Sequence, residues 1–346
     1  MELLEKLKAL TSAQGAAGAE GPAGALLAQW CEDLGEVKTD RFHNVLCTVR
    51  APKEGEPHLL LQAHLDEIGF MVTGVDANGL LTVTPCGGLD RRLQLASPVT
   101  VCTDSGMIPG VVAYTPAILT GGEGNIPKAD SMKIDIGYNK EKTEQLVLPG
   151  DRVVSALEPL ELENGLLSAK ALDNRSGCIA VLRAGELLAE HKDELSCGVT
   201  LLFGAMEEVG GHGTKVASFS LMPTHAIVVD VSFAATHDMS GEKYPGELGG
   251  GAMIGYSPLL AKEVYNDLLK LAKEKEIPTK KEIMGGFTGT DADGIATTGR
   301  GVRTGLISIP QRYMHTPVEV IDPKDVEQIG QLMAAYALNL KEGGEN

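Results

Sequence analysis

The polar residues that follow apolar runs are the part of this sequence with the clearest chemical meaning. An apolar run predicts a buried strand, yet the run LLLQAHLDEIGF (59–70) leads straight into His64, Asp66 and Glu67. Imidazoles and carboxylates are costly to bury unless something binds them. Further residues of the same types close apolar runs or lie in adjacent turns later in the chain. The candidate set is His64, Asp66, Asp173, Glu207, Glu208, Asp230 and His315.

The shared position of these residues favours a single site. Ligands of open α/β sheets bind outside the carboxyl ends of the strands, and most of the set follows a strand-like run. Imidazoles and carboxylates are ligands that divalent metals of the zinc type accept without any thiolate. The number of such groups suits two metals better than one. A bridging carboxylate would hold two cations close together, and together they could activate a water.

Each motif has an ordinary structural explanation when it is considered alone. A histidine at a strand end is more often part of a structural hydrogen bond, and adjacent glutamates are usually solvated. A single Asp230 after an apolar run could cap the next turn. The ordered combination HxD, DN, EE, D and H is much harder to obtain by chance. We therefore interpret the set as one site.

The composition argues against several classes of partner. The chain has 346 residues and a net charge of −17, which disfavours binding to nucleic acid and to anionic membranes. The stretch MELLEKLKALTSAQG predicts a short amphipathic helix without the features of a signal peptide. No apolar run approaches the length of a membrane span. Six cysteines without a CxxC pair indicate reduced thiols and therefore a cytoplasmic protein.

The segments that must position the site show two different patterns of apolar residues. Between residues 68 and 165 the pattern consists of short β runs with hairpin signals at Asn78-Gly79, Ser105-Gly106 and Asn164-Gly165. Outside that segment, apolar strands alternate with amphipathic helices, which is typical of an α/β sheet covered on both faces. The expected strands cover 45–49, 58–63, 198–206, 225–233 and 304–310, and the expected helices cover 1–15, 22–34, 177–191, 259–275 and 322–340.

This alternation predicts two domains. Residues 1–67 and 166–346 are expected to form an α/β catalytic domain with a mixed sheet and helices on both faces. A small all-β insertion over 68–165 interrupts this domain. The insertion contains none of the candidate ligands, which suggests a role in oligomerisation or substrate access.

Five stretches resemble the motifs of a known family and extend over nearly the whole chain. They are AHLDEIGFMV, AKALDNRSGC, EEVGGHGTKVA, VVDVSFA and ISIPQRYMHTPVEV. The sequence resembles the tetrahedral and glutamyl aminopeptidases, which are peptidases with two cocatalytic metals. That family is similar in plan as well, since a β-rich domain interrupts its α/β catalytic domain after the HxD strand.

The resemblance implies a metal-binding role for five residues. His64 and Asp230 bind one metal. Glu208 and His315 bind the other, and Asp173 bridges the two. The implied cofactors are two divalent metal ions per subunit, with zinc as the expected metal and cobalt or manganese as alternatives.

The resemblance also implies the reaction and the assembly. The reaction is removal of N-terminal residues from peptides by a water that two metals activate. Glu207 is the general base that takes a proton from this water, and Asp66 orients His64. The family further implies a homododecamer with its active sites facing an inner cavity. It also implies a cis peptide bond between Asp173 and Asn174.

Four positions depart from the family pattern, and this leaves the substrate preference open. His212, Asp293 and Arg303 stand where other residues are commoner, so they are candidates for the substrate pocket. Asn174 stands where a second aspartate is often found. None of the four is a candidate metal ligand.

Three other functions stay open at the level of the sequence. A carboxypeptidase or deacylase would need a cation for the substrate carboxylate, for which Arg303 and Arg312 are candidates. A glycosidase of the endoglucanase type would use two carboxylates, although Glu207 and Glu208 are adjacent and poorly placed to flank a sugar bond. A non-catalytic assembly protein would keep the fold, although the complete ligand set argues against it.

Overall fold

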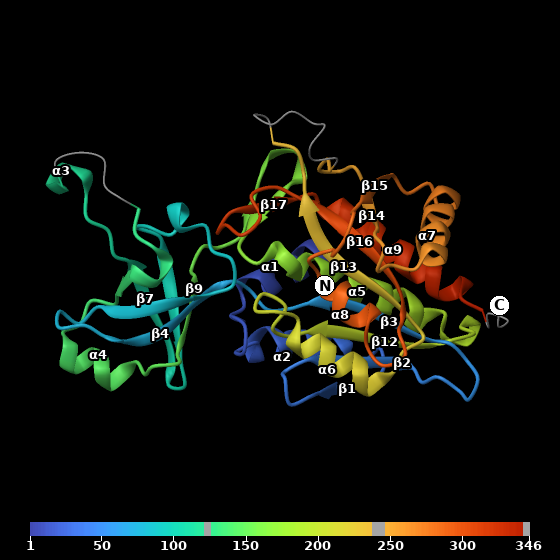
Figure 1. Cartoon of the computed structure of the whole chain (residues 1–346), viewed down its shortest axis with the longest axis horizontal. Helices are drawn as coiled ribbons and strands as arrows, with labels where there is room; N and C mark the ends of the chain where they lie inside the picture. Colours follow the sequence, from blue (N-terminus) through green and yellow to red (C-terminus); the bar gives the residue numbers. More distant parts are fainter. Residues whose placement is uncertain (121–125, 237–245, 342–346) are drawn as a thin grey trace.

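The computed structural model describes residues 1–120, 126–236 and 246–341, and every element below belongs to these residues. Figure 1 shows a larger α/β body and a smaller β body at one side of it. The first and the last of the described elements both belong to the larger body. The smaller body is built by the segment that begins directly after the HxD motif.

A mixed sheet forms the centre of the larger body. The inner strands β12, β3, β13 and β16 are parallel, whereas β2 and β14 run antiparallel to their inner neighbours. A mixed sheet is what the sequence predicts, so this part of the fold class is confirmed. Across the described residues the strand order is β1 (Glu36–Thr39), β2 (Val45–Arg50), β12 (Gly198–Gly204), β3 (His58–His64), β13 (His225–Phe233), β16 (Arg303–Gln311), β14 (Ala252–Tyr256) and β15 (Thr279–Ile283).

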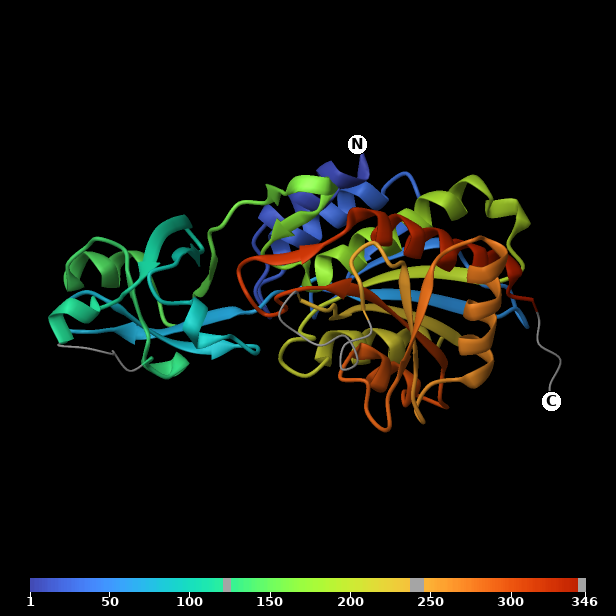
Figure 2. The ribbon, with the colours of Figure 1, turned by 90° about the horizontal axis from the view of Figure 1, so that it is seen from above.

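Helices cover both faces of the sheet, as expected from its continuous apolar strands. Leu59 and Leu61 of β3 pack into the core on one face, and Leu60 packs into the core on the other. Figure 2 shows the two helical layers above and below the sheet. One layer contains α1 (Leu3–Ser12), α2 (Gly21–Cys31), α5 (Leu172–Glu190), α7 (Lys262–Glu274) and α9 (Pro323–Asn339). The other contains α6 (His212–Leu221) and α8 (Asp291–Ala296).

The smaller body is a closed barrel with a core of its own. Phe70, Val83, Val101 and Val153 are among the side chains buried inside it. Two short helices lie in this segment, α3 (Ala117–Thr120) and α4 (Lys140–Leu146). The strand order around the barrel is β4 (Gly69–Val75), β5 (Leu81–Cys86), β8 (Lys133–Asp135), β7 (Gly106–Val112), β6 (Pro98–Thr103) and β9 (Arg152–Ser155).

A small third sheet lies where the chain re-enters the larger body. It contains β10 (Leu160–Glu161), β11 (Leu167–Ala169) and β17 (Glu319–Ile321). The predicted domain boundary at residue 165 falls between β10 and β11, which pair with each other. The division into 1–67, 68–165 and 166–346 stays a prediction. Short 3-10 turns complete the described elements at Arg91–Leu93, Ala129–Ser131, Glu163–Gly165 and Lys192–Glu194.

A buried ionic cluster ties the N-terminal helices to the strand that leads into the barrel. The Arg175 guanidinium is fully buried and donates to Glu67 Oε1 at 3.0 Å and to the Leu10 carbonyl at 2.7 Å. Lys170 Nζ donates to the other Glu67 oxygen at 2.7 Å. Because buried charges are stable only when paired and hydrogen-bonded, this cluster fixes the start of α5, where Asp173 lies. No helix of the described residues is long and apolar enough to cross a membrane.

We expect Arg175→Met to lower the free energy of unfolding by about 3–5 kcal/mol, because it removes one partner from a buried ionic cluster. Urea unfolding followed by circular dichroism measures the loss. Lys38→Met is the matched control, since Lys38 pairs with Glu36 on the surface, where both side chains are more than half exposed. A loss as small for Arg175→Met as for the control would contradict this account.

Candidate metal centre and active site

The candidate residues converge at the carboxyl edge of the parallel strands. His64 is the last residue of β3, and Asp230 lies in the second half of β13. Glu207 and Glu208 lie in the turn that follows β12. The two remaining ligand candidates come from the first turn of α5 and from the loop between β16 and β17. Segments far apart in the sequence therefore meet at one place, as the ends of neighbouring parallel strands must.

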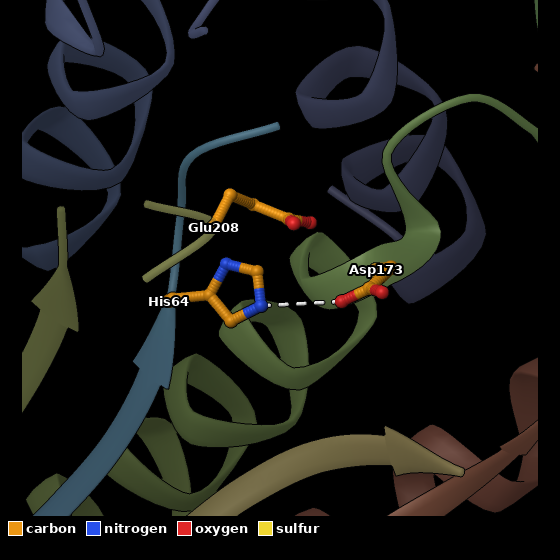
Figure 3. Close-up of side chains that lie close together, drawn as sticks. All are labelled: His64, Asp173 and Glu208. Atoms are coloured by element: carbon orange, nitrogen blue, oxygen red, sulfur yellow. Dashed lines mark hydrogen bonds and ion pairs between the residues drawn. The ribbon is translucent and has the colours of Figure 1, made fainter. Parts of the chain in front are cut away.

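One group of contacts surrounds the imidazole of His64. Its Nε2 lies 3.1 Å from Asp173 Oδ1 and 3.8 Å from Asp230 Oδ1. Figure 3 shows His64, Asp173 and Glu208 pointing toward one another, with the hydrogen bond between the first two drawn as a dashed line. These three residues each offer a ligand atom within 4.8 Å of the others.

A second group of contacts surrounds the imidazole of His315. Its Nε2 lies 3.3 Å from Asp173 Oδ2 and 3.7 Å from Glu208 Oε2. Asp173 therefore faces His64 with one carboxylate oxygen and His315 with the other. A carboxylate in this position can serve two neighbouring cations at once.

The carboxylates of the site carry more negative charge than the imidazoles can balance. Burial, and then the charge of Asp173, raise the pKa of Glu208 to about 8. Burial raises the pKa of Asp230 well above its usual range, and the charges of Asp173 and Glu207 raise it further. Burial would raise the pKa of Asp173 as well, but its contacts with His315 and His64 outweigh burial and lower it.

The excess of negative charge at these residues indicates whether metal ions would fit the site. Among the described residues, no Lys or Arg nitrogen lies within 4 Å of Asp173, Glu208 or Asp230. Buried carboxylates without a Lys or Arg partner accommodate cations, and the donor atoms here are imidazole nitrogens and carboxylate oxygens. The residues therefore fit divalent metals of the zinc type.

Glu207 lies beside the ligand set and has the properties of a proton acceptor. Its Oε2 lies 4.0 Å from His64 Nε2, and its side chain is 18% exposed. Burial raises the pKa of Glu207 to about 7, with further increases from the charges of Asp291 and Asp66. Carboxylates tuned toward neutral pH are efficient general bases.

Asp66 contacts both His64 and the backbone of Glu207 and Glu208. Its carboxylate is fully buried and accepts hydrogen bonds from the backbone N–H groups of Glu207 at 3.0 Å and Glu208 at 3.2 Å. His64 Nδ1 lies 3.4 Å from Asp66 Oδ1. Burial would lower the pKa of His64, but the facing carboxylates of Asp173 and Asp66 outweigh it and raise the pKa. Asp66 therefore positions the turn after β12 and faces the imidazole.

Sequence reasoning missed Glu319, which ties two candidate ligands together. Its buried carboxylate accepts from the backbone N–H of Asp173 at 3.0 Å and from that of His315 at 2.9 Å. The backbone of His315 has a φ of 62°, which residues other than glycine rarely adopt. The hydrogen bond that Glu319 accepts from His315 stabilises this backbone conformation. The only signal in the sequence is a charged residue inside the apolar stretch PVEV.

The barrel also reaches the site, although it supplies none of the candidate ligands. His315 Nδ1 donates to the carbonyl of Gly88, just after β5, at 2.8 Å. Because a carbonyl only accepts, Nδ1 carries a proton, and Nε2 is the nitrogen that faces the carboxylates and would bind a cation in exchange for its own proton. A Cβ at Gly88 would lie 2.8 Å from His315 Nδ1, so this close approach requires glycine. Contact with Asp173 is the main reason why the pKa of His315 rises to about 9.

A cavity of about 540 Å³ opens over the candidate ligands. Besides the ligands, it is lined by Ser232, Phe233, Glu282, Met284, Ser308 and Met314, together with the 288–290 loop. Asp293 does not line this cavity, but its carboxylate accepts from the backbone N–H of Thr288 at 3.0 Å and of Gly289 at 3.1 Å. Asp293 therefore shapes the cavity through the loop.

The structure does not bring two other pocket candidates to this cavity. His212 is exposed at the start of α6. Arg303 begins β16 and pairs with Glu263 at 3.4 Å. It lies at the amino end of β16, roughly 25 Å of strand away from Gln311. Asn174 follows Asp173 through a cis peptide bond, and its side chain donates to the Val229 carbonyl at 2.7 Å.

Sites with imidazoles and carboxylates outside the carboxyl edge of an α/β sheet are typical of metal-dependent hydrolases. The chain belongs to the M42 glutamyl aminopeptidase family, whose sequence model matches residues 44–332. The resemblance is thereby confirmed, and so are the fold class and the assignment to the hydrolases.

Individual relatives resemble the chain along most of its length. A lysyl aminopeptidase from Pyrococcus furiosus is 32% identical over 314 residues, which cover 88% of each chain. A glutamyl aminopeptidase from Lactococcus lactis is 31% identical over 353 residues, 98% of this chain and 97% of the relative. The TET1 peptidase of Pyrococcus horikoshii superposes with a TM-score of 0.86 at 28% identity. The superposition covers 98% of this chain and 100% of that peptidase. That peptidase assembles into a tetrahedron or a large octahedral shell.

We expect Glu319→Gln to weaken metal binding by about 10- to 100-fold while the protein stays folded, because residues that orient ligands have effects of this size. The amide has only one acceptor oxygen, so one of the two backbone N–H groups loses its partner. Competition with a chelator measures the affinity, and circular dichroism checks the fold. Glu163→Gln, at an exposed position, is the control. Unchanged metal affinity in Glu319→Gln would show that Glu319 does not position the ligands.

Proposed function

We propose that this protein is an aminopeptidase that hydrolyses N-terminal residues from peptides with the help of two divalent metal ions. The observation that carries the proposal is the position of Asp173 between His64 and His315, with one carboxylate oxygen toward each. His64 and Asp230 would hold one ion. Glu208 and His315 would hold the other, and Asp173 would bridge them.

Bound metal ions would supply polarisation of the scissile carbonyl and a lowered pKa for a bound water. Glu207 would accept the proton of that water, because its carboxylate lies beside the candidate ligands, 4.0 Å from His64 Nε2, and is not itself one of them. The same carboxyl group then donates the proton to the leaving amine. Asp66 keeps Glu207 in place through the backbone hydrogen bond at 3.0 Å.

The donor set supports zinc as the native metal, with cobalt and manganese as alternatives. Imidazole nitrogens together with carboxylate oxygens suit all three ions. The cysteines play no part, since none lines the cavity over the ligands.

The cavity favours an aminopeptidase over a carboxypeptidase or deacylase. A free substrate carboxylate needs a cationic partner, and no Lys or Arg lines the described part of the cavity. Arg303 lies at the far end of β16, and Arg312 Nε is engaged by the Ala235 carbonyl at 2.9 Å. Membership of an aminopeptidase family likewise favours peptide hydrolysis over the glycosidase and non-catalytic alternatives.

We also propose that the protein forms a homododecamer, a closed shell of identical subunits. The assembly of the similar TET1 peptidase supports self-association. The barrel exposes apolar side chains on its surface, including Met107, Ile118 and Leu119. Phe219 of α6 is also exposed. Surfaces of this kind are commonly covered by partner subunits, and closed symmetry is the usual arrangement.

We expect Glu207→Gln to lower kcat by about 10²- to 10⁴-fold while both metal ions stay bound, since Glu207 acts as base and not as ligand. Elemental analysis gives the metal content, and release of the first residue from a free peptide gives the rate. Release of C-terminal residues by the unchanged protein would refute the aminopeptidase proposal. Loss of metal from Glu207→Gln would refute its role as base.

We expect the protein to sediment with about twelve times the 36.4 kDa mass of the chain. Analytical ultracentrifugation at working concentration, with metal present, measures this mass. A monomer or a dimer under those conditions would rule the closed shell out.

A further inference from the structure

One carboxylate in the active-site cavity has no role in the proposed metal centre. Glu282 lies on the edge strand β15, is half-buried and lines the cavity together with the candidate ligands. Ser308 Oγ donates to Glu282 Oε2 at 2.8 Å, and Ser232 Oγ donates to the other oxygen. The two hydroxyl groups hold the carboxylate in a defined position in the cavity lining.

The neighbouring strand lets this side chain reach into the cavity. β14 lies between β15 and β16, and its residue in register with Glu282 is Gly255. Gly255 is also in register with Leu306 of β16. Because glycine has no side chain, Glu282 crosses over β14 and meets Ser308. A larger residue at 255 would crowd Leu306 and Met284, whose atoms lie 3.0 and 3.1 Å from a Cβ placed there.

The Glu282 carboxylate lies a short way from the metal ligands on the same face of the sheet. Ser308 is in register with Asp230 on the adjacent strand, so the two side chains point to the same face. Ser232 lies two residues beyond Asp230 on β13 and also shares this face, at a spacing of roughly 6–7 Å. The four-carbon stem of a lysine covers a separation of this order.

The charge of Glu282 has no cationic partner in the described part of the chain. No Lys or Arg nitrogen of the described residues lies within 4 Å of its carboxylate, and its polar contacts there are the two serine hydroxyls. A carboxylate has about four acceptor positions, so positions stay open toward the cavity. Glu282 differs in this respect from Glu67, which two buried cations neutralise.

Apolar side chains form part of the cavity wall, beside Ser232 and Ser308. Met284, Leu306, Met314 and Phe233 line the same cavity. A cavity lined by these apolar side chains and by the Glu282 carboxylate matches a side chain with an aliphatic stem and a cationic tip. An acidic side chain would be repelled there, since the described lining contains neither Lys nor Arg.

We propose that this cavity binds the side chain of the substrate's N-terminal residue and that Glu282 makes the enzyme prefer peptides beginning with Lys or Arg. The inference rests on the proposed aminopeptidase function and names its substrate class. Glu282 pairs with the ammonium or guanidinium tip, while Ser232 and Ser308 keep the carboxylate aligned. Glu282 acts in specificity and takes no part in the proton transfers.

The test compares kcat/KM for Lys, Arg, Leu and Glu aminoacyl amides with the metal-loaded enzyme. The Lys and Arg amides are expected to exceed the Leu amide by about 10-fold or more, with the Glu amide poorest. Glu282→Gln is expected to lower the Lys value by about 10- to 100-fold, the size of a lost charge-assisted hydrogen bond, and to change the Leu value less than about 3-fold. Ser308→Ala is expected to give a smaller loss of the same selectivity.

A second measurement separates side-chain binding from catalysis. In the Glu207→Gln background, calorimetry is expected to show tighter binding of a lysyl than of a leucyl tripeptide, and addition of Glu282→Gln is expected to abolish the difference. Glu274→Gln, at an exposed position on α7, is the matched control and is expected to leave both values unchanged. Metal content and circular dichroism confirm that each variant is intact.

The possible outcomes distinguish this inference from the proposed function. Absence of turnover on every amide would refute the aminopeptidase function itself. Turnover with a preference for Leu or Glu would overturn the inference and leave the function standing. An equal loss on all amides in Glu282→Gln would also overturn it, because Glu282 would then bind the α-ammonium group common to every substrate.

Discussion

Crowding of negative charge at a buried sheet edge is the constraint on which the rest of this structure depends. Asp173, Glu208 and Asp230 lie within a few ångströms of two imidazoles, and burial raises the pKa of Glu208 and Asp230. Among the described residues, no Lys or Arg pairs with these three carboxylates, and backbone N–H groups hold the two acidic residues beside them. Asp66 and Glu319 each accept two such hydrogen bonds. The backbone around the ligands is thereby held rigid, and the excess charge is left for cations.

The sequence predicts the ligand candidates because their signal is local. His64 and Asp230 interrupt apolar runs that form parallel strands, and parallel strands end at a common edge. Glu319 and Glu282 have no such signal. Glu319 lies in a strand of three residues, and Glu282 lies on the polar edge strand TKKEI, which does not show the apolar pattern of a buried strand. Helix α6 begins after Gly211 in a left-handed conformation and is rich in Ser and Thr, so its pattern is weak as well.

Departures from a family pattern identify positions of interest, but they do not show whether those positions lie at the cavity. Arg303 and Ser308 lie on the same strand, yet of these two only Ser308 lines the cavity, because it lies five positions further toward the carboxyl end of β16. Asp293 affects the cavity only through the backbone of the 288–290 loop. Such relations depend on strand direction and register, which single-residue comparison does not contain.

The contact between His315 and Gly88 bears on how far the two bodies of the molecule can be treated as interchangeable modules. The acceptor is a main-chain carbonyl at the exit of β5, and the imidazole it orients belongs to the other body. A barrel grafted from a relative would fold on its own core and still misalign this imidazole if its chain left β5 at a different angle. The graft would have to include the Cys86-Gly87-Gly88 junction together with the loop that contains His315. Such an exchange must therefore conserve the contact between the two bodies, because conserving either body by itself is not enough.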